Sequence, residues 1–268
     1  MKKTFLTLFI TAALVLTLGQ NAEARGIKDA QNILTVGATP VPHAQLLNLI
    51  KDDLAAEGIT LKVVEFTDYV QPNVALIAGD LDANFFQHIP YLETNEDWSN
   101  KLVSAFGVHV EPFGLYSQKY DNIADLPNGA SIAIPNDPSN GGRALLLLQA
   151  NGIITLKDGA GLTATSRDIA NNPRNFRFQE LEAAQLPRSL QDVDAATING
   201  NYAMEAGFNP ITDSLIIEGA DSPYVNIVVV QKGKEQSKNI LALKKALLST
   251  KVRDYINKNY DGGVAPIF

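Results

Sequence analysis

Cysteine is absent from the 268 residues of this sequence, which also hold only three histidines, two methionines and one tryptophan. Without thiols there can be no disulfide bonds, thiol catalysis or thiolate metal sites, so stability must come from core packing. Excess positive charge is also missing, since the net charge is −7 and the pI is about 5.0. A nucleic-acid partner is therefore not expected, because phosphate neutralisation needs a basic face.

The N-terminus carries a short apolar run. Two lysines precede the apolar residues 5–18, and Ala22 and Ala24 supply the small residues of an A-x-A cleavage site. The run is too short for a comfortable bilayer-spanning helix, which needs about 20 residues. We therefore predict a cleaved signal peptide at residues 1–24, with a retained N-terminal anchor as the alternative. No later segment is long and apolar enough to cross a membrane.

Strand-like apolar runs then alternate with segments of helical periodicity. In the first unit we expect strands at 33–38, 61–66, 81–86 and 101–110, with helices at 43–57 and 70–78. Short βαβ connections of this kind imply a parallel sheet. In the second unit we expect strands at 113–120, 130–135, 175–181 and 194–198, and helices at 143–150 and 183–190. A strand at 224–230 and two terminal helices at 237–248 and 251–259 follow this unit.

Two successive α/β units followed by terminal helices predict two lobes, with the C-terminal segment returning to the first. We assign residues 31–112 to lobe I, residues 113–228 to lobe II and residues 229–268 to the return into lobe I. A single doubly wound domain is the alternative.

Motifs for metal binding or catalysis are missing. His43, His88 and His109 lack H-x-x-H or H-E-x-x-H spacing, and no acidic cluster accompanies them. No nucleophile elbow, P-loop or dinucleotide-binding motif follows a strand. We therefore predict no metal site, no cofactor and no catalytic residue.

A polar loop at residues 136–142 lies between an expected strand and an expected helix. Free backbone N–H groups and the helix dipole favour an anion at such a place. Arg143, expected on the first helical turn, would add a planar charged fork suited to a carboxylate. The alternative for Arg143 is an ordinary surface ion pair. The two glycines Gly141 and Gly142 can be interpreted as part of a tight turn.

Aromatic residues and a histidine gather where the third expected strand ends. Phe86 ends this strand and His88 and Tyr91 follow it, and the carboxyl edge of an open α/β sheet is where ligands bind. Phe86 and Tyr91 can wall an apolar pocket, with His88 as its polar group. Tyr69 follows another strand and is a similar candidate. The alternative for each is ordinary core packing.

Two asparagines complete the set of candidates. Asn199 ends an expected strand, and Asn226 lies within an apolar one, where a buried amide needs partners. A turn for Asn199 and a backbone hydrogen bond for Asn226 are the alternatives. A charged clamp, neutral amides and an aromatic wall together match a zwitterion with an apolar tail, that is, an amino acid.

The sequence resembles the NlpA lipoprotein family, whose members are methionine-binding components of ABC importers. The resemblance runs from about Ile33 to the C-terminus and is carried by five segments in order. They are NFFQHIPYL (84–92), IPNDPSNGGRALLLL (134–148), QLPRSL (185–190), VDAATIN (193–199) and SPYVN (222–226).

This resemblance implies a two-lobed periplasmic binding protein fold of type II, in which each lobe is a mixed β-sheet flanked by helices. It also implies that methionine binds in the cleft between the lobes, and that a monomer delivers it to an inner-membrane ABC permease and its ATPase. The implied ligand-binding residues are Tyr69, Phe86, His88, Tyr91, Arg143, Asn199 and Asn226. Arg143 would hold the carboxylate, and the aromatic residues would surround the thioether.

One departure from the family pattern concerns the lipid anchor. Family members usually carry an acylated cysteine after the export signal, whereas Gln20 stands there in this sequence. We therefore expect a freely diffusing periplasmic protein.

Three other functions stay open at the level of sequence. The same fold can bind another apolar amino acid or a short methionine-containing peptide, since one methylene changes affinity by only about 1–3 kcal/mol. An enzyme with His88 as general base is a second possibility, but no acid or nucleophile is found for it. A surface adhesin without a ligand is the third.

Overall fold

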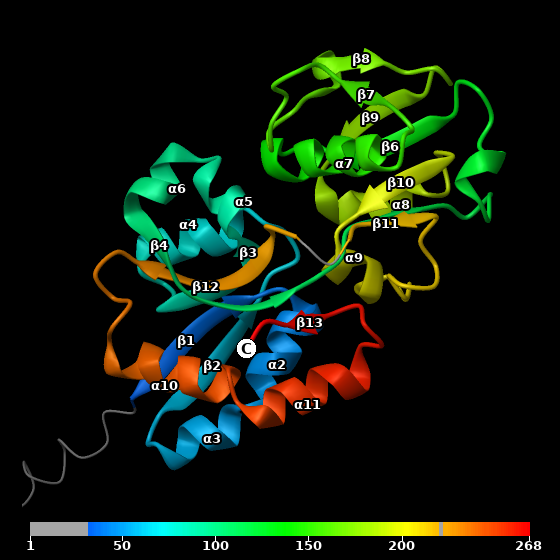
Figure 1. Cartoon of the computed structure of the whole chain (residues 1–268). Helices are drawn as coiled ribbons and strands as arrows, with labels where there is room; N and C mark the ends of the chain where they lie inside the picture. The colour runs from blue at the N-terminus through cyan, green and yellow to red at the C-terminus, as the bar shows by residue number, and fades with distance from the viewer. Residues whose placement is uncertain (1–31, 220–221) are drawn as a thin grey trace, which may run out of the picture.

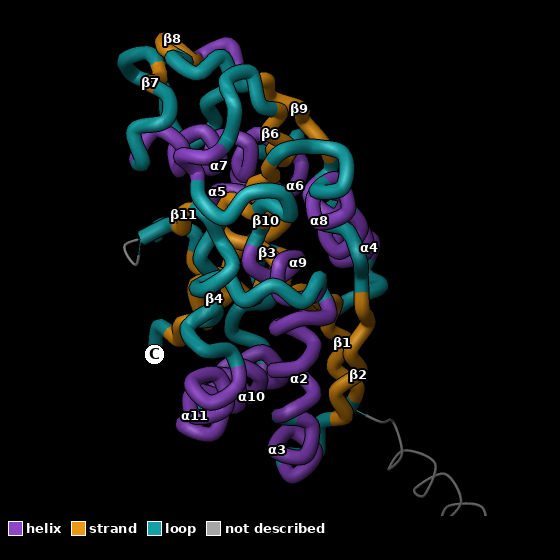
Figure 2. Tube along the Cα trace, turned by 90° about the vertical axis from the view of Figure 1, so that its right-hand side faces the viewer, coloured by secondary structure: helices purple, strands orange, loops and turns teal. Residues whose placement is uncertain are grey.

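Two sheets divide the computed structural model, which describes residues 32–219 and 222–268, into two lobes (Figure 1). The predicted signal peptide at residues 1–24, with Gln20, lies outside these residues. Among the helices of the described part, none is long and apolar enough to cross a membrane. Viewed from the side, β7 and β8 lie at one end of the molecule and α3 and α11 at the other (Figure 2).

The first lobe is built on a six-stranded sheet with the order β13-β4-β12-β3-β1-β2. Its strands are β1 (Ile33–Ala38), β2 (Thr60–Glu65), β3 (Ala83–His88), β4 (Leu102–Val110), β12 (Val225–Gln231) and β13 (Ala265–Pro266). β1 is parallel to β2 and to β3, as the short βαβ connections predict. β12 is antiparallel to both of its neighbours, β3 and β4, so the sheet is mixed.

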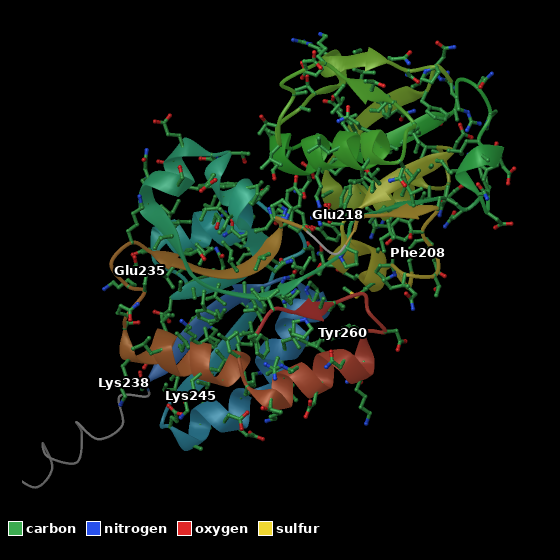
Figure 3. All side chains as sticks on the ribbon, in the orientation of Figure 1. Phe208, Glu218, Glu235, Lys238, Lys245 and Tyr260 are labelled. Carbon is green, nitrogen blue, oxygen red and sulfur yellow. The ribbon has the colours of Figure 1, made fainter. Side chains whose placement is uncertain are left out.

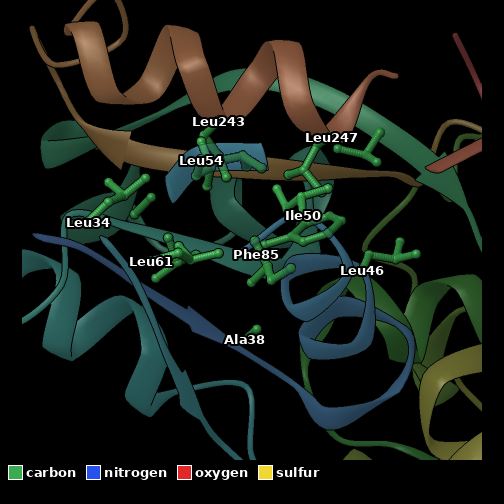
Figure 4. Packing of buried hydrophobic residues seen from close by; sticks show 14 of the residues in the cluster. Leu34, Ala38, Leu46, Ile50, Leu54, Leu61, Phe85, Leu243 and Leu247 are labelled. Atoms are coloured by element: carbon green, nitrogen blue, oxygen red, sulfur yellow. The ribbon is translucent and has the colours of Figure 1, made fainter. Parts of the chain in front are cut away.

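Helices cover both faces of this sheet (Figure 1). One face carries α2 (Gln45–Leu49), α3 (Lys51–Ala56), α10 (Lys238–Leu247) and α11 (Thr250–Asn259), and the other carries α4 (Gln71–Ala78), α5 (Ile89–Glu93) and α6 (Glu96–Lys101). Alternate residues of β12 serve the two faces, because successive side chains of a strand point to opposite sides. Val228 belongs to the core cluster that contains Leu243 and Leu247 of α10, whereas Val229 belongs to the cluster that contains Leu76 of α4. Figure 4 shows Leu243 and Leu247 in the first of these clusters.

The second lobe has a five-stranded sheet with the order β11-β5-β10-β6-β9. Its strands are β5 (Gly114–Tyr116), β6 (Ser131–Pro135), β9 (Arg177–Leu181), β10 (Ala195–Ile198) and β11 (Ile216–Ile217), and β7 (Thr155–Leu156) pairs separately with β8 (Ile169–Asn171). α7 (Pro138–Ala150) packs on one face, and α8 (Leu186–Ser189) and α9 (Gly200–Glu205) pack on the other. β6 is parallel to β9 and β10, whereas β5 runs antiparallel to β10.

The chain passes between the lobes after β4 and again after β11 (Figure 1). The first crossing leads directly into β5, which is antiparallel to β10 in the second sheet. The second crossing leads directly into β12, which is antiparallel to β3 in the first sheet. The expected boundary of lobe II at residue 228 needs correction, because β12 from Val225 onward is hydrogen-bonded into the first sheet. Its β-branched sequence identified a strand but could not identify the sheet to which the strand belongs.

Three expected elements differ in their extent. The helix expected at 43–57 is broken at Ile50, whose φ and ψ of −100° and 6° are not helical, into α2 and α3. The strand expected at 113–120 is paired only over β5. The loop expected at 136–142 is mostly helix, since Asp137 caps α7 and Pro138 begins it, a position that proline favours.

Candidate functional site

A cavity between the two lobes is lined by all seven residues that the sequence singled out. Its lining consists of Tyr69, Phe86, Gln87, His88, Tyr91, Glu111, Asn140, Arg143, Asn199, Gly200, Asn201 and Asn226. The cavity has a volume of about 20 Å³, which is room for about one water molecule. The lobes are therefore closed on each other, and an amino acid can enter only when they or their side chains separate.

The carboxyl edges of both sheets supply this lining. His88 is the last residue of β3, and Asn199 follows the last residue of β10. Asn226 lies near the start of the antiparallel β12, in register with His88, so it reaches the same edge of the first sheet. The two edges face each other across the cavity, which is the placement expected for ligand sites in open α/β sheets.

His88 is held by two hydrogen bonds and is buried, with 5% of its surface exposed. Its Nδ1 accepts a hydrogen bond of 3.2 Å from the backbone N–H of Tyr91, so Nε2 must carry the hydrogen of the neutral ring. Nε2 donates to Asn140 Oδ1 on the second lobe at 3.2 Å. Neither ring nitrogen offers a free lone pair, so the alternative of a general base at His88 gains no support.

Burial and, to a smaller extent, the charge of Arg143 lower the pKa of His88 to about 3. The unfolded chain takes up a proton below its ordinary pKa near 6.5, whereas the folded chain does not, so stability is lost as the pH falls from 6.5 towards 3. This single residue accounts for about 1.4 kcal/mol per pH unit within that window. We expect the gap in unfolding free energy between the wild type and His88→Gln to narrow by about that amount between pH 5.5 and 4.5.

Urea unfolding at a series of pH values measures this gap, and effects of the other titratable groups cancel because both proteins contain them. Stability curves that stay parallel over this range would show that His88 titrates normally in the folded protein.

Aromatic rings form one wall of the cavity. The ring centroids of Tyr69 and Phe86, and likewise of Tyr69 and Tyr91, lie 5.8 Å apart. The Tyr91 hydroxyl donates to the backbone oxygen of Tyr69 at 3.0 Å, and the Tyr69 hydroxyl donates to Asn201 on the second lobe. Tyr202 stacks on Tyr69 from the second lobe at 4.9 Å. The wall is therefore apolar on its faces, with the Tyr69 and Tyr91 hydroxyls already bonded.

Arg143 lies one turn further into α7 than the sequence predicted, so it is not on the first turn. Asp137 occupies the N-terminus of that helix and accepts from the backbone N–H of Asn140 at 2.9 Å. The predicted anion site at the helix N-terminus is therefore filled by the protein's own carboxylate. The charge available to a ligand is that of the Arg143 side chain instead.

The Arg143 guanidinium is 4% exposed and is held on several sides. Its Nε and Nη2 donate to the two carboxylate oxygens of Glu218, and Nη2 also donates to the backbone oxygen of Glu111 at 3.0 Å. The rings of Tyr224 and Phe113 lie 4.1 and 5.0 Å from its central carbon. Among the described residues Nη1 has no acceptor, so this nitrogen of the guanidinium remains available to a ligand. Glu218 lies where the chain passes between the lobes (Figure 3).

Amides around the cavity leave several polar atoms without partners. Asn199 donates through Nδ2 to Asn140, but its buried Oδ1 has no partner among the described residues. Asn201 accepts from Tyr69 through Oδ1, and its buried Nδ2 is likewise unpaired within the described part of the chain. Asn226 Oδ1 faces His43 Nε2 at 3.1 Å. Unpaired buried polar atoms cost stability, which indicates that a ligand completes these bonds.

A buried cluster of His43, His109 and Glu111 lies beside the cavity, although sequence spacing gave no sign of it. His109 Nε2 and His43 Nε2 lie 2.7 and 3.4 Å from the same oxygen of Glu111. Burial lowers the pKa of His43 to about 4 and that of His109 to about 3, and it raises the pKa of Glu111. Donors on one tetrahedral zinc ion lie about 3.3 Å apart, given bonds of about 2.0 Å. The 2.7 Å contact therefore fits a hydrogen bond better than a shared ion.

Five lining residues were missed by the sequence reading: Gln87, Glu111, Asn140, Gly200 and Asn201. Asn140 lay in the segment read as a polar loop, and Glu111 was read only as the end of a strand. Asn201 follows Asn199 by two residues, so extending the candidate strand end by one turn would have found it.

The two mixed sheets, the two crossings and the cavity between facing carboxyl edges define a two-lobed periplasmic binding protein fold of type II, as the resemblance implied. Residues 34–268 match the family model described as NlpA lipoprotein. The chain belongs to the NlpA lipoprotein family.

Several relatives are similar over most of this chain. The methionine-binding lipoprotein MetQ of Bacillus subtilis is 40% identical over 275 residues, covering 100% of this chain and 99% of that protein. The D-methionine-binding lipoprotein MetQ of Salmonella typhimurium is 46% identical over 77% of each chain. Among solved structures, a nutrient binding protein from Burkholderia cenocepacia bound to methionine has a TM-score of 0.84 and 45% identity, covering 88% of this chain and 100% of the other.

Proposed function

We propose that this protein captures methionine, as the L or D enantiomer, between its lobes and delivers it to the permease of an ABC importer. The observation that carries this proposal is the set of buried, unpaired polar atoms beside an aromatic wall. Arg143 Nη1 suits a carboxylate, Asn199 Oδ1 suits an ammonium group, and the rings of Phe86 and Tyr91 suit a thioether. The names of the methionine-binding relatives point to the same ligand.

The roles of the remaining candidates follow from this pose. With Asn226 Oδ1 turned to His43, its Nδ2 is the group that can meet the ligand carboxylate. Tyr69 closes the cavity towards solvent through its contacts with Asn201 and Tyr202 on the second lobe. His88 holds the two lobes together through Asn140 and performs no chemistry. We therefore propose a binding protein without turnover.

Delivery would depend on the closed state, because a permease and its ATPase can respond only to a conformation that the ligand favours. That the protein works as a monomer in the periplasm, without a lipid anchor at Gln20, remains a prediction from the sequence.

Thermal unfolding of ligand-free protein against a panel of L- and D-amino acids tests the proposal. Ligand at about 1,000 times its dissociation constant adds roughly 4 kcal/mol to the native state. For a chain of this size we expect methionine to raise the Tm by about 8–16 °C. A larger shift with leucine would make another apolar amino acid the ligand.

A short methionine-containing peptide is the second candidate. A groove of about 520 Å³ adjoins the cavity and shares Tyr69 and Tyr91 with it, so an extended ligand could continue into that groove. A flat response to all free amino acids, with a shift from Gly-Met or Met-Gly, would favour the peptide and would contradict the proposal of methionine.

A further inference from the structure

A chain of side-chain hydrogen bonds runs from the surface of the second lobe to the cavity, and its first member is Asp137. The two carboxylate oxygens of Asp137 accept from Asn140 Nδ2 at 3.1 and 3.0 Å. An ionised carboxylate can only accept hydrogen bonds. The NH₂ end of the Asn140 amide must therefore face Asp137, and its Oδ1 must face the other way.

The other end of the chain is fixed by the backbone. His88 Nδ1 accepts from the N–H of Tyr91, which can only donate, so the hydrogen of the His88 ring lies on Nε2. This N–H points to Asn140 Oδ1 at 3.2 Å, in agreement with the orientation that Asp137 imposes. Asn140 is thus fully bonded, with its orientation determined from both lobes.

Asn140 in turn determines the orientation of Asn199. Asn140 Oδ1 also accepts from Asn199 Nδ2 at 2.8 Å, which turns Asn199 Oδ1 away from it. Asn199 is 6% exposed and lines the cavity, and its Oδ1 has no partner among the residues that the structure describes. The cavity therefore presents a fixed acceptor that only a hydrogen-bond donor can satisfy.

We propose that Asp137, acting through Asn140, orients the Asn199 amide so that the cavity selects ligands with an amino group. Asp137 and Asn140 are positioning residues in this scheme, and the recognised group is the α-ammonium of an amino acid. The inference rests on the proposed function, because it concerns which part of the amino acid the cavity requires. A site built to bond a substrate N–H discriminates strongly against an analogue without it, because its polar groups are then left unpaired.

The test compares two ligands that share a carboxylate and a thioether, L-methionine and 4-(methylthio)butanoate, which lacks the amino group. For the wild type we expect calorimetric titration to give at least a roughly hundredfold preference for methionine. Asp137→Asn offers a donor as well as an acceptor to Asn140, so only the bond from His88 still holds the Asn140 amide, and both amides turn over in part of the molecules. In this variant we expect the preference, measured as the ratio of the two dissociation constants, to fall at least about tenfold. The fall should come from weaker binding of methionine, while binding of the analogue stays nearly unchanged.

Two further variants make the result specific. Asp137→Ser retains one side-chain oxygen that can cap α7. It lacks the second oxygen that accepts from Asn140 Nδ2, so this variant should also lose the preference for methionine. Asp168→Asn removes another capping carboxylate of the same lobe, bonded to Thr165 away from the cavity, and should keep the preference.

An unchanged preference in folded Asp137→Asn and Asp137→Ser would overturn the inference, as would an equal loss of affinity for both ligands or a loss of preference in Asp168→Asn. If the wild type binds methionine without preferring it to the analogue, the inference fails and the proposed function stands. If the wild type binds neither ligand, the proposed function fails as well.

Discussion

Replacing Arg143 with methionine should weaken methionine binding at least roughly thirtyfold, because losing a buried charged partner of a ligand carboxylate costs about 2–5 kcal/mol. The same change should lower the free energy of unfolding by about 3 kcal/mol, since Glu218 would be left without its partner. Calorimetric titration measures the first effect and urea unfolding the second.

Glu218 allows the two effects to be separated. In Arg143→Met/Glu218→Gln the unpaired carboxylate is gone, so much of the stability should return while binding stays lost. Arg253→Met is the matched control, because Arg253 is an exposed arginine that lies 5.3 Å from the ring centre of Phe268, outside the cavity. Wild-type affinity in the double variant would show that Arg143 serves only the structure.

Replacing Gly142 with alanine should destabilise the second lobe by about 1–3 kcal/mol, the range typical of overpacked sites. A Cβ at Gly142 would lie 2.2 Å from the backbone oxygen of Leu162 and 3.0 Å from the backbone nitrogen of Ala164. These are backbone atoms and cannot turn aside as a flexible side chain could. Either α7 or the segment around Leu162 must move.

Gly161→Ala provides the comparison in the same segment, because a Cβ there meets no atom within 4 Å. Its unfolding free energy should stay within about 0.5 kcal/mol of the wild type. Urea midpoints of the two variants test the difference. Equal midpoints would mean that the segment around Leu162 yields without cost.

The glycine pair also shows how far sequence reasoning reached. Gly141 and Gly142 were expected in a loop because residues 136–142 are rich in turn residues, yet both lie within α7. Gly142 is needed there because the Leu162 segment approaches it closely, a contact between residues 20 positions apart that no local pattern reveals. The same limit explains why β12 was identified as a strand but was divided at residue 228 between the two lobes.

The candidate site was easier to find than its bonding. Tyr69, His88 and Asn199 were found because each follows an expected strand, and strand ends of parallel sheets converge on one edge. The pairing of Arg143 with Glu218 joins residues 75 positions apart, and the cluster of His43 with Glu111 has no regular spacing. Composition and periodicity locate a sheet edge, but they do not show which polar groups on it are already satisfied by the protein.

The two crossings between the lobes limit how the protein can open. A single connection would leave one lobe free to swing and twist about the other in any direction. With two connections, after β4 and after β11, the lobes can rotate about the line that joins the crossings, but other relative movements are restricted. The open protein therefore samples few orientations, and little rotational entropy is lost on closing. A larger share of the contact energy then remains as affinity for the ligand.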